Sequence, residues 1–107
     1  MEIRESEKYC IITPLSPKLD ERQTQRLISE IVSSEKRVGI DMSYVKDCTI
    51  DFINRLTKLN LSLFNIQSDI FALLLNMDMD KTWDLFVSEM DFTENKHRLL
   101  NRKFNIV

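Results

Sequence analysis

The chain has 107 residues, 43% of them apolar, which is enough for one domain with one core. Its 15 basic and 17 acidic side chains leave a formal net charge of −2, which argues against a nucleic-acid binder, since such a protein would carry a clear basic excess. No apolar run approaches the ~18 residues that cross a bilayer, and the charged opening MEIRESEK does not read as a secretory leader. We therefore expect a single cytoplasmic domain over 1–107 without membrane insertion, in which residues 1–8 form an edge strand and turn and 103–107 a C-terminal tail.

The predicted strands are short and rich in apolar and β-branched residues, and they lie at 2–4, 9–13, 38–42, 61–66 and 83–87. The run YCIIT at 9–13 ends at Pro14, which cannot continue a ladder. Residues 38–42 are short and apolar, as a strand covered on both faces would be. A short helix is the alternative at 83–87, where Trp83 and Phe86 are expected to pack in the core.

Helices are predicted between and after these strands, at 21–34, at 50–59, at 69–77 and from Thr93 to about Arg102. Asp20 and Ser68 are expected N-caps, as is Thr93 for the last helix. The helix at 69–77 is apolar nearly all round, which favours burial, although exposure of Phe71 or Leu75 for docking is the alternative. Strands that alternate with helices predict an α/β fold with a mixed, largely parallel sheet of four to five strands, covered by about four helices.

The segment 37–59, RVGIDMSYVKDCTIDFINRLTKL, gives the strongest functional indication. In α/β proteins, the place where a strand delivers the chain to an exposed helix N-terminus usually carries the working surface. Here that place holds Asp47, Cys48, Thr49 and Asp51. The turn has no glycine and no histidine, and it is not a lysine-bearing phosphate loop. We therefore expect a surface that another protein contacts, and no catalytic site.

The order and spacing of the elements over roughly residues 9–100 resemble a STAS domain, the fold of bacterial anti-sigma-factor antagonists and of the cytoplasmic tails of sulfate transporters. The resemblance is carried by YCIITPLSPKLD, by VGIDMSYV with the helix that follows it, and by LSLFNIQSDIFALLLNMDMDKTWDLF. It implies a STAS-like sheet and a role in protein binding, signal transduction and transcription regulation.

Signalling members of this family carry Asp-Ser-Ser-Gly at the start of the second helix, and a partner kinase phosphorylates the first Ser. Aligned without gaps from Asp41, this chain has Thr49, Ile50, Asp51 and Phe52 at the four positions. Because Ile50 has no hydroxyl, we expect no phosphorylation switch of the family's kind. Thr49, one residue early, is the nearest possible modification site, and Asp51 supplies a permanent negative charge.

The expected partner-binding residues are Asp47, Cys48, Thr49, Ile50, Asp51 and Phe52. Ile50 and Phe52, if exposed, would be apolar anchors, and the two acids would steer the partner. The alternative is that Thr49 is only an N-cap, that Cys48 is a small buried residue and that the acids only complement the helix dipole.

Three functional hypotheses follow. The first is a non-catalytic interaction module whose partner, by resemblance, is an anti-sigma factor or a kinase of that type. The second is a small STAS subunit of a larger assembly, such as an ABC-type lipid transport ATPase complex. The third is an enzyme with Cys48 as nucleophile, which lacks a visible base because His97 is the only histidine. We therefore predict no catalytic residue, no cofactor and no metal.

Overall fold

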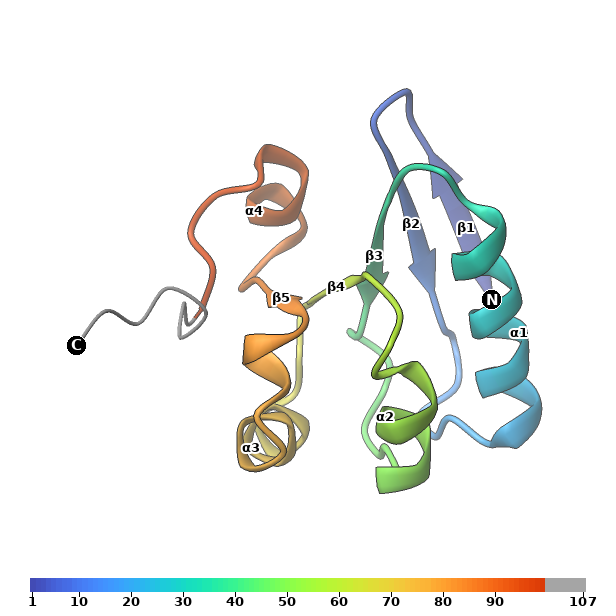
Figure 1. The fold of residues 1–107 in the computed structure, drawn as a ribbon, viewed down its shortest axis with the longest axis vertical. Helices are drawn as coiled ribbons and strands as arrows, with labels where there is room; N and C mark the ends of the chain where they lie inside the picture. Colours follow the sequence, from blue (N-terminus) through green and yellow to red (C-terminus); the bar gives the residue numbers. More distant parts are fainter. Residues whose placement is uncertain (100–107) are drawn as a thin grey trace.

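Residues 1–99 are described by a computed structural model, which confirms the predicted α/β fold (Figure 1). The five strands are β1 (Glu2–Glu5), β2 (Tyr9–Thr13), β3 (Arg37–Asp41), β4 (Ser62–Phe64) and β5 (Asp84–Leu85). They form one sheet in the order β1-β2-β3-β4-β5. β1 pairs antiparallel with β2, and every other neighbouring pair is parallel. The sheet is therefore mixed and largely parallel, as predicted.

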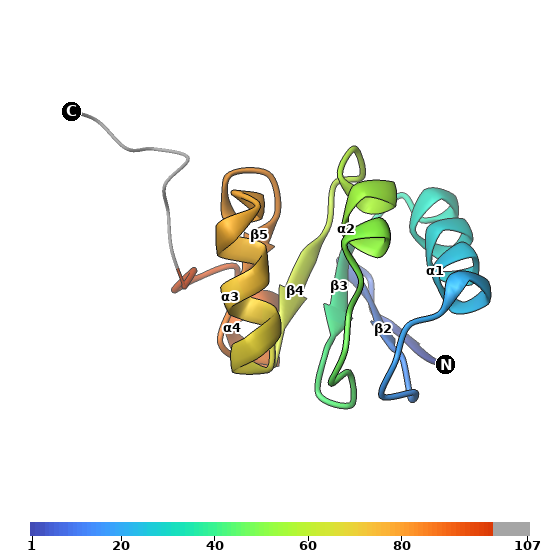
Figure 2. The same ribbon diagram turned by 90° about the horizontal axis from the view of Figure 1, so that it is seen from below.

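The helices are α1 (Glu21–Ser33), α2 (Ile50–Leu56), α3 (Ser68–Asn76) and α4 (Glu89–Glu94), with a short 3-10 helix, η1, at Met79–Lys81. A parallel sheet whose strands follow one another in chain order, joined by right-handed crossovers, places all the crossover helices on one face. Figure 2 shows α1, α2 and α3 side by side along the sheet. The opposite face is left for α4.

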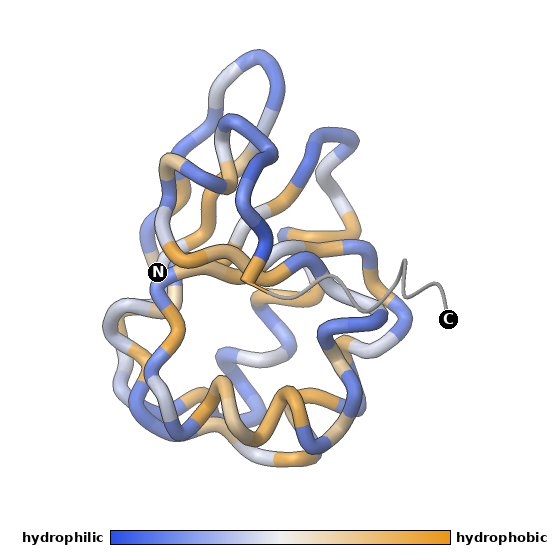
Figure 3. The backbone as a smooth tube through the Cα atoms, turned by 90° about the vertical axis from the view of Figure 1, so that its left-hand side faces the viewer, coloured by the Kyte–Doolittle hydropathy of each residue, from blue (hydrophilic) through white to orange (hydrophobic). Residues whose placement is uncertain are grey.

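The alternation of side chains along β2 divides the core between these two faces. Cys10 and Ile12 point into the larger cluster, which the sheet forms with α1, α2 and α3. Ile11 points the other way, into a small cluster with Phe64, Phe86 and Phe92, the last of which comes from α4. Figure 3 shows hydrophobic stretches through the middle of the molecule and hydrophilic turns at its top.

Local capping explains where α1 begins. Asp20 accepts a hydrogen bond from the backbone N–H of Gln23 at 2.9 Å, and its own N–H donates to Gln23 Oε1 at 3.4 Å. This capping box satisfies two backbone donors that a helix start would otherwise leave unpaired. The predicted cap at Asp20 is confirmed.

Two other predicted caps are wrong. Gln67 occupies the N-cap position of α3, and Ser68 is already its first helical residue. Ser88, rather than Thr93, caps the last helix by accepting from the N–H of Asp91 at 3.3 Å. That helix ends at Asn95, whose left-handed backbone (φ 56°) stops it. The predicted helix from 93 onward is therefore not formed within 95–99, while its remainder and the predicted tail at 103–107 lie outside the described residues.

The strand predicted at 83–87 is shorter in the structure, but Trp83 and Phe86 are both buried, as predicted. The apolar helix α3 buries Ile70 and Leu74 and leaves Phe71 half-buried. Within residues 1–99, no helix combines the length and the apolar character that a membrane crossing requires.

Candidate protein-interaction surface

Because β2, β3, β4 and β5 are parallel, the loops that follow them leave the sheet at the same edge. The β2–α1 and β3–α2 loops are joined there by backbone hydrogen bonds. The N–H groups of Lys46 and Asp47 donate to the carbonyl of Pro17 at 2.8 and 3.0 Å. This edge is therefore one connected surface.

Exposed apolar side chains are concentrated at this edge. Of the eight large apolar side chains that are exposed among residues 1–99, four belong to loops after parallel strands or to the first residue of α2. These four, with exposed fractions between 52% and 57%, are Leu15, Tyr44, Ile50 and Val87. We call them the edge surface. Single exposed apolar residues need no explanation, but several on the loops of one sheet edge make that edge the candidate interaction site.

Tyr44 owes its outward position to its neighbours in the turn. Met42 and Val45 are fully buried on either side of it. The N–H of Val45 donates to the carbonyl of Met42 at 3.1 Å, which closes a tight turn. With both neighbours fixed in the core, the chain presents Tyr44 to solvent.

The start of α2 is organised by Thr49, whose hydroxyl accepts from the N–H of Phe52 at 3.0 Å. The simple N-cap interpretation of Thr49 is thereby confirmed. Ile50 is the first helical residue and is 57% exposed, whereas Phe52 is 2% exposed and packs in the larger cluster. Ile50 can serve as an anchor for a partner. The expected role of Phe52 as an anchor is wrong, because its side chain is part of the core.

The same burial removes Cys48 from the surface. Its Sγ lies 3.8 Å from the carbonyl of Thr49, and its side chain belongs to the larger cluster. Burial, with a smaller contribution from the charge of Asp47, raises the pKa of the Cys48 thiol to about 12. Because the side chain is buried, Cys48 does not fit the expected role of contacting a partner. Because the thiol is protonated near neutral pH, Cys48 does not fit the role of a thiolate nucleophile either.

No imidazole assists Cys48 either. His97 is exposed and precedes Arg98, which pairs with Asp84 of β5, far along the sheet from the β3–α2 loop. Within the described chain, no three side chains of His, Cys, Asp or Glu gather closely enough to hold a metal ion. Asp47 and Asp51 are both exposed, and Asp51 lies in the first turn of α2, where it also complements the helix dipole.

A groove lies at the β5 end of this edge. Apolar side chains form most of its walls, and it encloses about 260 Å³. Its lining residues are Asn65, Ile66, Ser68, Phe71, Phe86, Val87 and Leu99. Sequence reasoning missed this groove because its walls come from three separate segments of the chain, 65–71, 86–87 and Leu99.

Sequence reasoning also missed Leu15 and Tyr44. A local signal existed for Tyr44, because it stands alone between the apolar residues Met42 and Val45 in a short turn. Leu15 lies between Pro14 and Pro17, a spacing that indicates a surface loop.

No protein-family model matches this chain, and a search of curated proteins finds no similar sequence. The resemblance to STAS domains stays a prediction from the order of the elements and the residues quoted for it.

Proposed function

We propose that this protein is a non-catalytic interaction module that binds a regulatory protein through its edge surface, as anti-sigma-factor antagonists of the STAS type do. The observation that carries the proposal is the exposure of Tyr44 and Ile50 on a turn and helix start whose other apolar residues are buried. Tyrosine is enriched at protein interfaces, and bulky side chains that fill a partner's pocket supply most of the binding free energy.

The surroundings of these two side chains suit a binding surface. Lys46, Asp47 and Asp51 are exposed beside them and would form a charged rim. The backbone hydrogen bonds to Pro17 hold the turn in place before any partner arrives. Such preorganisation lowers the entropy that binding must overcome.

Binding without a phosphorylation switch also agrees with the local chemistry. Ile50 offers no hydroxyl, and the Thr49 hydroxyl is engaged as the helix cap. This favours a constitutive interface, which supports the second candidate function, a small subunit of a larger assembly such as an ABC-type transport ATPase. We place either role in the cytoplasm, since both cysteines are unpaired thiols, as is usual in a reducing compartment.

Capture of partners by the tagged protein from an extract of its own host tests the proposal. Tyr44→Ala combined with Ile50→Ala, and separately Asp51→Lys, are expected to reduce the captured amount of the main partner at least tenfold while the protein stays folded. Only Asp51→Lys should lower the melting temperature slightly, because it removes an acid from the first turn of α2. Val32→Ala is the matched control, because Val32 is at least as exposed as Tyr44 and Ile50 but lies near the end of α1, at the opposite edge of the sheet. Equal capture by wild type and the double variant would refute the proposed surface.

Mass spectrometry of the captured material separates the two candidate roles. Regulatory proteins such as a kinase or an anti-sigma factor support the first, and an ATPase subunit supports the second. Mass spectrometry of the tagged protein itself shows whether Thr49 is phosphorylated.

A further inference from the structure

Asp41 is a buried carboxylate at the end of β3, next to the proposed surface but not part of it. It lies one residue beyond Ile40, so its side chain points to the face of the sheet opposite α1, α2 and α3. Burial of a charged carboxylate is costly unless hydrogen bonds compensate it. Its partners therefore show what the charge is used for.

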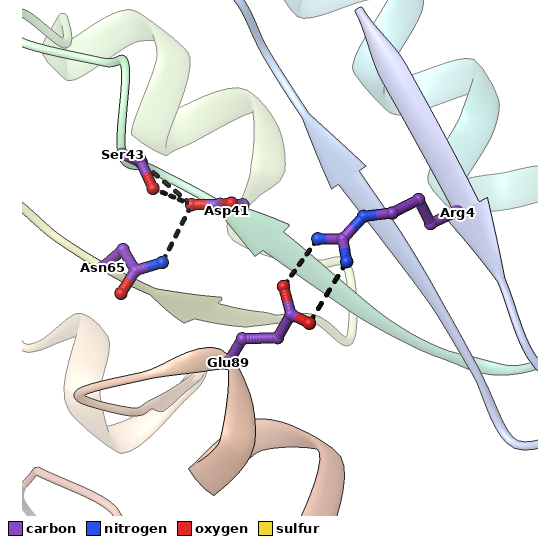
Figure 4. Close-up of polar contacts among 5 residues, drawn as sticks. All are labelled: Arg4, Asp41, Ser43, Asn65 and Glu89. Atoms are coloured by element: carbon purple, nitrogen blue, oxygen red, sulfur yellow. Dashed lines mark hydrogen bonds and ion pairs between the residues drawn. The ribbon is translucent and has the colours of Figure 1, made fainter.

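Three hydrogen bonds converge on the same oxygen of Asp41, as Figure 4 shows. The backbone N–H of Ser43 donates to Oδ1 at 3.0 Å, and the Ser43 hydroxyl donates to the same atom. The third donor is Nδ2 of Asn65, at 3.1 Å. Two of the three bonds fix the residue immediately before Tyr44, and the third comes from the loop after β4.

Further hydrogen bonds extend this connection. Nε2 of Gln67 donates to the carbonyl of Ser43 at 3.2 Å, and the N–H of Asn65 donates to the carbonyl of Val87 at 3.3 Å. Asn65 adopts a left-handed backbone (φ 56°), which Asn tolerates better than most residues. Through Asp41, the turn that carries Tyr44 is tied to the loops after β4 and β5.

We propose that Asp41 is the positioning residue of the edge surface: it does not touch the partner, but it holds the Ser43–Tyr44 turn in the conformation that the partner meets. This inference rests on the proposed function. A carboxylate suits the task because hydrogen bonds to an ionised acceptor are roughly twice as strong as neutral ones. The carboxylate also lies near a positive charge. Hydrogen bonds to Glu89 are the main cause of the raised pKa of the Arg4 guanidinium, and the negative charge of Asp41 contributes to the same shift.

Arg4 and Glu89 provide a matched control for this role. Arg4 Nη2 and Nη1 donate to the two carboxylate oxygens of Glu89 at 2.6 and 3.1 Å (Figure 4). Glu89→Gln thus changes a carboxylate in the same neighbourhood without removing any hydrogen bond of the Ser43–Tyr44 turn. Asp41→Asn is the conservative variant, since its amide oxygen can still accept from Ser43.

Amide hydrogen exchange of the full chain, read residue by residue by NMR, tests the positioning role without a partner. Asp41→Ala is expected to speed exchange of the Ser43 and Val45 amides at least tenfold relative to the slow amides of α1. Asp41→Asn should restore most of the protection, and Glu89→Gln should leave it unchanged. Ser43→Ala, an exposed substitution, should produce a smaller increase and keeps the test valid if Asp41→Ala does not fold.

Unchanged exchange in the turn of Asp41→Ala, or of Ser43→Ala where the former does not fold, would overturn the inference. So would an equal acceleration in Glu89→Gln. The capture assay then separates the two proposals. If Asp41→Ala loosens the turn and also loses the partner, as the Tyr44→Ala/Ile50→Ala double variant does, both proposals are supported. If Asp41→Ala loosens the turn but keeps the partner while the double variant loses it, the positioning role fails and the proposed surface stands. If the double variant keeps the partner, the proposed function fails, whatever the exchange experiment shows about the turn.

Discussion

The ring of Phe92 lies directly against the backbone of Gly39. A Cβ built on Gly39 would meet Cζ of this ring at 2.6 Å, a distance that real Cβ atoms essentially never show, so any larger residue would force the ring to move. The ring is enclosed on its other sides by Phe64 and Phe86, with centroids 5.4 and 6.0 Å away, and by the Arg37 guanidinium, 4.5 Å from its centroid. The six-residue helix α4 is thus anchored on the sheet by one aromatic side chain over the chain's single glycine.

Gly39→Ala is therefore expected to destabilise the protein by about 1–3 kcal/mol, because the added methyl group overpacks a fully buried site. The free energy of unfolding from urea titration measures the change. Phe92→Leu supplies the control through a double-mutant cycle. Because leucine leaves room for the added methyl group, Phe92→Leu should reduce the free energy of unfolding less in the Gly39→Ala background than in wild type. The expected difference, which is the coupling energy, is about 0.5–3 kcal/mol. Strictly additive losses would show that the two residues are not in contact.

Thr49→Ala is expected to cost about 0.5–2 kcal/mol of stability, since it leaves the Phe52 N–H at the start of α2 without its side-chain acceptor. Thr49→Ser and Thr49→Asp keep an acceptor and should remain close to wild type. The free energies of unfolding of the three variants, measured by urea titration, check this prediction. If Ala and Ser are indistinguishable, the cap does not contribute to stability.

The start of α2 also allows a contrast between two apolar side chains two residues apart. Phe52→Ala should lose about 3–5 kcal/mol because it opens a cavity in the core. Ile50→Ala should change stability by no more than about 0.5 kcal/mol, as is usual for exposed sites. The melting temperatures of the two variants check this. Comparable losses would mean that Ile50 is not available to a partner.

The raised pKa of Cys48 predicts that the free energy of unfolding depends on pH above about pH 8. A free thiol has a pKa of about 8.5, whereas the pKa of Cys48 in the folded protein is about 12. Between these values the unfolded chain releases this proton and the folded chain keeps it, so stability falls as the pH rises through that window. The fall in the urea midpoint from pH 8 to pH 10 should be shallower in Cys48→Ala. Burial also raises the pKa of Cys10, so Cys10 lowers stability at high pH in the same direction. Because Cys10 is present in both wild type and Cys48→Ala, the difference between the two proteins reports on Cys48.

Thiol labelling gives an independent check. At pH 8 the folded protein should react with an aromatic disulfide reagent far more slowly than the urea-unfolded chain, since both cysteines are buried. Rapid labelling of Cys48 in the folded protein would contradict its burial.

Particular residues show how far the sequence could predict the site. The N-cap at Thr49 was visible because a cap depends on residues within one turn of it. Which apolar residue of α2 faces solvent was less visible, since Ile50, Phe52 and Ile53 fit the same stripe and only the sheet's position selects Phe52 and Ile53 for burial. The start of α4 was missed for a similar reason. Both Ser88 and Thr93 are residue types that cap helices. The helix starts at Ser88 because this places Phe92 within α4 and against Gly39, a residue 53 positions earlier in the sequence.

The sequence by itself determined the alternation of strands and helices, the capping of α1 and the absence of a hydroxyl at Ile50, because each depends on side-chain type and on neighbours within a few positions. Only the tertiary structure decided that Leu15, Tyr44, Ile50 and Val87 share one edge, and that Asp41 meets Asn65 behind it. The physical reason is that the order of the strands in the sheet, which pairs residues far apart in the chain, sets which loops lie next to each other.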